Sequence, residues 1–206
     1  MEVLKKGFIA IISTILTVTA FAQNDAALQS VFSESYTLEY NKKYNDAIAL
    51  LKRNYNEKSY ELNLRLGWLC YSNKNYTQSQ QYYQQAVNLK SYAIEAKLGL
   101  LKPLAALELW DKVLDEYEAI LKIDPQNYTA NYWEGVLLYN RKKYEAASRL
   151  FEKLVNLYPF DYDANHMLGW SYLNLGRKSD AALMFNKALL NRPSDASCLD
   201  GLGRLK

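Results

Sequence analysis

Apolar residues recur along this chain at helical spacing, and the pattern as a whole returns every 34 residues. It is plainest in two successive sets of four positions, Tyr144, Ala147, Phe151 and Pro159 followed by Lys178, Ala181, Phe185 and Pro193. Each period holds two segments whose apolar residues lie three and four positions apart, which predicts two amphipathic helices joined by a turn. Two further steps of 34 residues and a last step of 32 residues extend the pattern back toward the N-terminus. Five units are therefore predicted, over residues 28–59, 60–93, 94–127, 128–161 and 162–195.

Small and large residues have different predicted roles within the unit. Gly169 and Ala181 let the two helices of the last pair approach closely, and Phe185 fills the seam to the next pair. Pro193 ends the second helix, because proline disfavours helical backbone in the residue before it. The same roles fall one unit earlier to Gly135, Ala147, Phe151 and Pro159.

The third unit departs from this pattern. Leu101, Val113 and Ile120 stand where other units carry small residues, and Pro103 lies inside the first helix. Because proline has no N–H to donate to the carbonyl of Gly99, we expect a kink there and a bend that divides the array into two halves.

The fifth unit carries the most complete set of the repeated residues. The set is a leucine-glycine pair, a tyrosine, an alanine before and after a phenylalanine, and a closing proline, namely Leu168, Gly169, Tyr172, Ala181, Phe185, Ala188 and Pro193. This set resembles the signature of the tetratricopeptide repeat family. The resemblance extends over residues 28–195 and implies an all-α fold, a right-handed superhelical solenoid of five helix-turn-helix repeats. Since no Gly-, Ser- or Pro-rich linker divides the repeats, one domain is predicted. A fold of this kind carries many functions, so the resemblance leaves the activity open.

The chain continues beyond the fifth unit with leucines at three-residue spacing, Leu199, Leu202 and Leu205. We interpret residues 196–206 as a short capping helix that covers the edge of the fifth unit, as repeat arrays require. Its short length, together with Gly201 and Gly203, makes this helix marginal. The alternative is that a second chain completes this edge, through which the protein would oligomerise.

Residues 1–22 have the composition of a secretory signal peptide. Lys5 and Lys6 precede an uncharged stretch, and small residues at Ala20 and Ala22 suit a signal peptidase. The stretch is shorter than the roughly 20 residues that a membrane-spanning helix needs. We therefore predict cleavage after Ala22 and export to a bacterial periplasm or out of the cell. Left uncleaved, this segment would be the membrane anchor.

The charge distribution argues against one class of partner. The chain carries 25 basic and 22 acidic residues, a formal net charge of +3, and its lysines and arginines are scattered. Nucleic-acid binding depends on basic side chains gathered along one surface, so no nucleic-acid partner is expected.

Two cysteines, Cys70 and Cys198, are the only ones in the chain. They lie nearly four repeats apart, which places them far beyond the roughly 6 Å between Cα atoms that a disulfide requires. Cys70 shares an apolar column with Leu104 and Leu138, which favours a buried thiol. For Cys198 the pattern leaves both a buried and an accessible thiol open.

The sequence offers little for catalysis. His166 is the only histidine, which provides neither several imidazoles for zinc nor a spare base for a Ser-His-Asp arrangement. Acids such as Asp161 and Asp163 lie at helix starts, where the helix dipole accounts for them. We therefore expect no catalytic residues, no metal ligands and no cofactor.

One side of the first helices is rich in aromatic residues. Positions spaced by four and then three residues fall on this side, offset from the packing side. In the tetratricopeptide repeat family it lines the concave surface where peptides are held, so the resemblance implies a partner-binding groove. Its predicted residues are Phe32, Tyr36, Trp68, Tyr71, Lys102, Tyr132, Tyr139, His166 and Trp170. Rigid rings offer large contact area at small entropic cost. The alternative for each ring is packing against a neighbouring first helix.

The leading hypothesis is a non-enzymatic interaction scaffold of the cell envelope that binds a protein or peptide in this groove. A second is a carrier of glycans or other small ligands, in which Trp68, Tyr71 and Trp170 stack on sugar rings. A third is an accessory subunit of an enzyme complex in the envelope.

Overall fold

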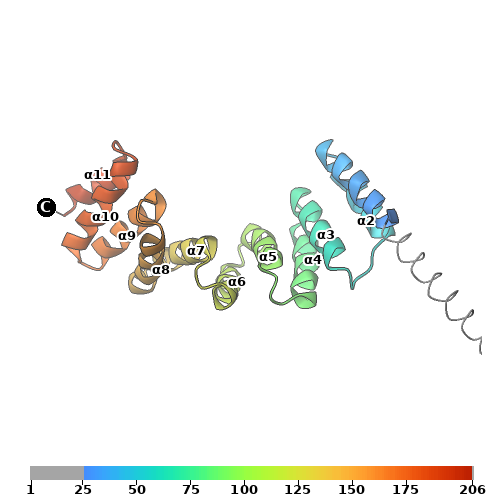
Figure 1. Cartoon of the computed structure of the whole chain (residues 1–206), viewed down its shortest axis with the longest axis horizontal. Helices are drawn as coiled ribbons and strands as arrows, with labels where there is room; N and C mark the ends of the chain where they lie inside the picture. The colour runs from blue at the N-terminus through green and yellow to red at the C-terminus, as the bar shows by residue number, and fades with distance from the viewer. Residues whose placement is uncertain (1–25, 206) are drawn as a thin grey trace, which may run out of the picture. The chain divides into compact units, whose positions relative to one another are not determined.

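A computed structural model describes residues 26–205, and its regular elements over that range are all helices. A helix over residues 26–40 is followed by α2 (Tyr44–Arg53), α3 (Tyr60–Ser72), α4 (Tyr76–Leu89), α5 (Ile94–Ala106), α6 (Trp110–Ile123), α7 (Tyr128–Asn140), α8 (Tyr144–Leu157), α9 (Tyr162–Asn174), α10 (Lys178–Asn191) and α11 (Ala196–Gly203) (Figure 1). Helices of 13 and 14 residues alternate from α3 to α10. The predicted all-α fold of paired helices is confirmed. The predicted signal peptide lies outside the described residues.

The helices group into two compact units, one ending at Leu107 and the other beginning at Glu108. Unit 1 contains the helix over residues 26–40 and α2 to α5, and unit 2 contains α6 to α11. The division falls between the two helices of the third predicted repeat. Helix α5 continues through Pro103, whose carbonyl accepts the N–H of Leu107 at 3.0 Å. The bend in the array and the single domain stay predictions.

Glycines of unit 2 make room for an aromatic ring. Phe185 of α10 is fully buried, and a Cβ added at Gly169 of α9 would lie 2.7 Å from its ring. A Cβ at Gly201 of α11 would lie 2.5 Å from the same ring. The predicted roles of Gly169 and Phe185 are confirmed. Gly201, which the sequence suggests is a weakness of the cap, is required for α11 to pack.

Unit 1 uses the same arrangement around a tyrosine. Tyr83 of α4 lies between Gly67 of α3 and Gly99 of α5, where added Cβ atoms would approach its ring to 2.8 and 2.2 Å. Leu101 stands at the position that glycine holds in the neighbouring repeats, and its side chain is buried. The third repeat therefore does have a small packing residue, Gly99, two positions before the one where the sequence pattern places it.

Polar side chains at the start of the first helices stabilise most of the repeats. The side chains of Ser59, Asn127, Asp161 and Asp195 each accept the backbone N–H three residues later, which caps α3, α7, α9 and α11. Buried amides donate to two carbonyls of the preceding turn, as Asn63, Asn131 and Asn165 do. Tyrosine hydroxyls donate to an acid at the start of the next first helix or its cap, in the pairs Tyr60–Glu95 at 2.7 Å and Tyr128–Asp161 at 2.9 Å.

The third repeat differs at each of these positions. Ala93 stands at the N-cap of α5 and provides no side-chain hydrogen bond. Ile94 occupies the position of the tyrosine, and Lys97 that of the buried amide. The repeat that differs at all three positions is also the one at which the chain divides into two units.

Replacing Ala93 with asparagine is expected to stabilise unit 1 by about 1 kcal/mol, the usual contribution of an N-cap side chain. Its φ of −77° and ψ of 103° already have the extended conformation that a capping residue adopts. Urea unfolding followed by circular dichroism measures the change. Ala106→Asn, at the other end of α5, is the matched control and should give no stabilisation. Equal effects of the two substitutions would contradict the capping role.

Candidate functional site

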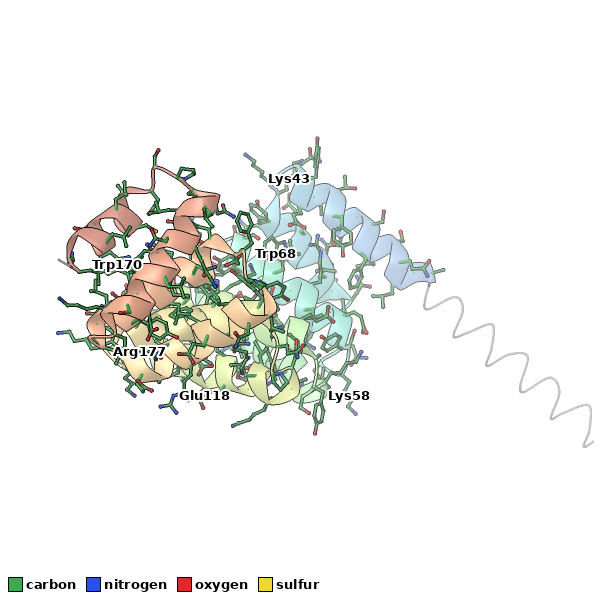
Figure 2. The ribbon with its side chains drawn as sticks, turned by 60° about the vertical axis from the view of Figure 1, so that its left-hand side comes forward. Lys43, Lys58, Trp68, Glu118, Trp170 and Arg177 are labelled. Carbon is green, nitrogen blue, oxygen red and sulfur yellow. The ribbon has the colours of Figure 1, made fainter. Side chains whose placement is uncertain are left out.

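The aromatic face of unit 1 is formed by the helix over residues 26–40, α3 and α5. The rings of Phe32 and Tyr36 have centroids 6.5 Å apart, and those of Trp68 and Tyr71 are 6.1 Å apart. Trp68 is labelled on α3 in Figure 2. The Nζ of Lys102 lies 5.5 Å from the centroid of Trp68 and 5.9 Å from that of Tyr71. The structure therefore brings Lys102 of α5 to two of the predicted aromatic residues of α3.

An ion pair joins α3 to the helix over residues 26–40 on this face. Arg65 of α3 pairs with Glu39, its Nε donates to the Oγ of Ser35 at 3.1 Å, and its guanidinium lies 3.9 Å from the centroid of Tyr36. Glu39 also accepts the indole N–H of Trp68. Arg65 is buried, whereas Tyr36 is 55% exposed. Sequence reasoning missed Arg65, although its position three residues before Trp68 places both on one side of α3.

Replacing Arg65 with methionine is expected to lower the free energy of unfolding by about 2 kcal/mol. The substitution leaves the Glu39 carboxylate without its cation, and the partial exposure of Glu39 keeps the cost below that of a fully buried pair. A double-mutant cycle with Glu39→Gln, measured by urea unfolding, tests the coupling. The double variant should recover part of the loss. Strictly additive effects would show that the two side chains do not stabilise each other.

A hollow of about 620 Å³ lies at the start of this face. It is lined by Leu28, Gln29, Phe32, Ser33, Tyr36 and Glu61. Phe32 and Tyr36 both belong to the predicted groove. The hollow joins apolar rings to a carboxylate, which suits a segment carrying an apolar side chain beside a polar or basic group.

The aromatic face of unit 2 is centred on Trp170 of α9, labelled in Figure 2. His166 stacks on Tyr162, with centroids 5.4 Å apart and planes 14° apart, and contacts Trp170 edge-on at 6.5 Å. Tyr139 of α7 is joined to α9 by its hydroxyl, which accepts from the Nδ2 of Asn174 at 3.0 Å. The structure thus places Tyr139, His166 and Trp170 in one connected set.

Two of the predicted rings of unit 2 also contribute to packing. Tyr132 stacks on Tyr128 at 6.1 Å and meets the ring of Phe151 at 6.1 Å. Trp170 contacts the buried ring of Phe185 at 5.3 Å. Each ring therefore contacts a buried ring of a second helix while remaining half-exposed. The binding role of Tyr132 and Trp170 stays a prediction.

The short helix α11 adds polar groups that sequence reasoning missed. The Oγ of Ser197 lies 2.8 Å from the Nε2 of His166 and accepts from the indole nitrogen of Trp170 at 3.0 Å. The guanidinium of Arg204 lies 5.2 Å from the centroid of Trp170. Arg204 follows Trp170 by one 34-residue period, so extending the aromatic column into the cap would have identified it.

Both cysteines are free and fully buried. Burial raises the pKa of the Cys70 thiol to about 11 and, together with the hydrogen bond and charge of Asp195, that of Cys198 to about 12. The accessible thiol that the sequence left open for Cys198 is therefore excluded. Burial also lowers the pKa of His166, which is then neutral at physiological pH.

One buried carboxyl has no obvious structural role. Glu134 of α7 is 8% exposed, and its Oε2 has no hydrogen-bond partner among the described residues. Burial raises its pKa to about 7, with a smaller contribution from Glu118, while Lys153 acts in the opposite direction. Nothing in the sequence pattern identifies it, because Glu134 directly precedes the packing residue Gly135 and reads as an ordinary polar helix position.

Among the residues that the structure describes, no helix is both long and apolar enough to cross a membrane.

Comparison with known families and structures supports the repeat architecture. Tetratricopeptide repeat models match residues 60–92, 93–162 and 150–183, which together span more than half of the chain. A search of curated proteins found no significant match.

Solved structures with the same fold share little sequence with this chain. A tetratricopeptide repeat protein from Parabacteroides merdae is 19% identical, with a TM-score of 0.73 over 86% of this chain and 71% of that one. YrrB, described as a TPR protein with an unusual peptide-binding site, is 16% identical, with a TM-score of 0.68 over 82% of this chain and 89% of its own. MamA from AMB-1 is 17% identical, with a TM-score of 0.69 over 85% and 97%. The family models and the paired helices together show that this chain belongs to the tetratricopeptide repeat family.

Proposed function

We propose that this protein is a non-enzymatic interaction scaffold that binds an extended or helical segment of a partner protein on the aromatic faces of its first helices. The observation that carries the proposal is the hollow in unit 1, where the predicted groove residues Phe32 and Tyr36 line a space of about 620 Å³. Tyr36 is 55% exposed there, although its ring lies beside Phe32 and the Arg65 guanidinium, so it presents an apolar surface to solvent.

Charges beside the rings define the preferred ligand. The hollow contains Glu61, whose carboxylate suits a basic group, and Lys102 lies over Trp68 and Tyr71 farther along the same unit. A segment that binds across unit 1 would therefore combine apolar side chains with a basic group at one end and an acidic group at the other. YrrB, with the same fold, is described as having a peptide-binding site, which supports a peptide as the ligand class.

The cell envelope is the proposed location. This part of the proposal rests on the composition of residues 1–22, in which Lys5 and Lys6 precede an uncharged stretch that ends with small residues. N-terminal sequencing of the protein isolated from its native host tests it. A mature chain that begins at Gln23 supports export, whereas a chain that retains Met1 or Glu2 contradicts cleavage.

A peptide-display screen against the purified chain tests the binding function. Selected peptides should bind in solution and lose about tenfold or more in affinity when Lys102 or Tyr36 is replaced with alanine, since both side chains are exposed. Tyr92→Ala is the matched control, because Tyr92 is 81% exposed in the turn between α4 and α5. Selected peptides whose binding depends on Tyr92 and not on Lys102 or Tyr36 would move the site off this face.

A glycan carrier is the second candidate, and the surroundings of Trp170 favour it. Ser197 and Arg204 place a hydroxyl and a guanidinium group beside that ring, and sugar recognition uses polar groups of this kind. A glycan array probed in parallel with the peptide screen separates the two functions. Saccharide binding that is lost in Trp170→Phe, without any selected peptide, would replace the scaffold proposal.

A further inference from the structure

Side chains of three metal-binding types meet where α11 packs against α9. A ring nitrogen of His166, a carboxylate oxygen of Asp195 and the Sγ of Cys198 all lie within 4.8 Å of one another. His166 comes from the second turn of α9, Asp195 is the N-cap of α11, and Cys198 lies one turn farther along. The chain has one histidine and two cysteines, so this cluster contains its only imidazole and one of its two thiols.

The internal repeat shows that two of these three residues are unusual at their positions. Alanine occupies the position of Cys198 in the three preceding repeats, as Ala96, Ala130 and Ala164. The position of His166 holds Leu64, Leu98 and Tyr132 in earlier repeats. Capping explains Asp195, because Asn127 and Asp161 do the same at their helices. Packing needs only an alanine and an apolar residue at the other two positions, so it does not explain the imidazole or the thiol.

We propose that His166, Asp195 and Cys198 bind one Zn²⁺ ion between α9 and α11. Nitrogen, oxygen and sulfur ligands are the set that zinc accepts, and three protein ligands leave a fourth position for water or for a group of a partner. The thiol proton passes to solvent as the ion binds. The resulting thiolate and the Asp195 carboxylate then supply two negative charges that balance the charge of the ion.

Neighbouring side chains already hold the ligands in place. The Oγ of Ser197 lies 2.8 Å from the Nε2 of His166, and the same oxygen accepts the indole N–H of Trp170 at 3.0 Å. Tyr162 stacks on the imidazole, and its hydroxyl bonds to Asp195. Contacts of this kind fix the orientation of ligands in metal sites and strengthen binding. The buried Cys198 lies at the inner end of the cluster, with His166 and Asp195 half-buried beside it.

Metal titration of the purified full chain tests the site. After removal of metal with a chelator, the protein is titrated with Zn²⁺ in competition with a chromophoric chelator, and separately with Co²⁺. One Zn²⁺ per chain is expected, and Cys198→Ser and His166→Gln should each weaken binding by about tenfold or more. The Co²⁺ form should show a thiolate charge-transfer absorption that Cys198→Ser abolishes.

Two further variants separate metal binding from folding. Asp195→Asn keeps the cap of α11, because asparagine caps helices as well as aspartate, yet it removes the carboxylate and should weaken Zn²⁺ binding. Cys70→Ser removes the other buried thiol, whose neighbour is Gln78, and should leave binding unchanged. Absence of stoichiometric binding would overturn the proposal. So would an affinity or a Co²⁺ spectrum that Cys198→Ser leaves unaltered, since the ion would then be held by surface carboxylates.

Discussion

Replacing Phe185 with alanine is expected to lower the free energy of unfolding of unit 2 by about 4 kcal/mol, within the range measured for buried phenylalanines. The ring is fully buried and lies between Gly169 of α9 and Gly201 of α11. Because neither glycine has a side chain that can move into the space, the cavity should persist and the cost should not fall to the lower end of that range. Urea unfolding followed by circular dichroism measures the loss.

Leu183→Ala is the matched control for this prediction. Leu183 lies on the same helix two residues earlier and is 52% exposed, so its truncation should cost less than about 1 kcal/mol. Similar losses for the two variants would show that α9 and α11 move together to fill the cavity. The packing between these helices would then be less rigid than its geometry indicates.

Replacing Glu134 with glutamine is expected to stabilise unit 2 at pH 8 by about 3 kcal/mol and to remove a pH dependence. Burial raises the folded-state pKa of Glu134 to about 7 from an ordinary value of 4.5. Between these values the folded state holds a proton that the unfolded state has lost, so stability falls as pH rises from about 4.5 to 7. Above pH 7 the carboxylate is ionised in both states and the penalty stays constant. The size of the effect follows from about 1.4 kcal/mol for each pKa unit.

The measurement is the difference in unfolding free energy between the wild-type protein and Glu134→Gln at several pH values. Taking the difference removes the contributions of other titrating groups, His166 among them. Below pH 4.5 the two proteins should be close in stability, and they should diverge up to pH 7. Parallel curves would show that Glu134 ionises at its ordinary pKa, through water or through a shift of Lys153 toward it.

The candidate site was partly predictable from the sequence, because helical spacing alone assigns residues to one side of a helix. Phe32, Tyr36, Trp68 and Tyr71 fall on such a side, and the structure connects them in unit 1. The ion pair of Arg65 with Glu39 was not predictable, because it joins two helices whose relative register depends on packing. Arg204 lies one 34-residue period after Trp170, so the spacing does place it in the same column as that ring.

The sequence by itself determined the period, the pairing of helices and the glycine and aromatic packing positions such as Gly169 and Phe185, because these depend on spacing along the chain. Tertiary structure alone decided which residues meet between neighbouring repeats. The ring of Phe185 contacts glycines sixteen residues before and after it, and Tyr83 does the same with Gly67 and Gly99. That interval is set by the way a second helix packs between two first helices, and a 34-residue period does not reveal it. The meeting of His166 and Cys198 arises from the same packing, which brings α11 against α9.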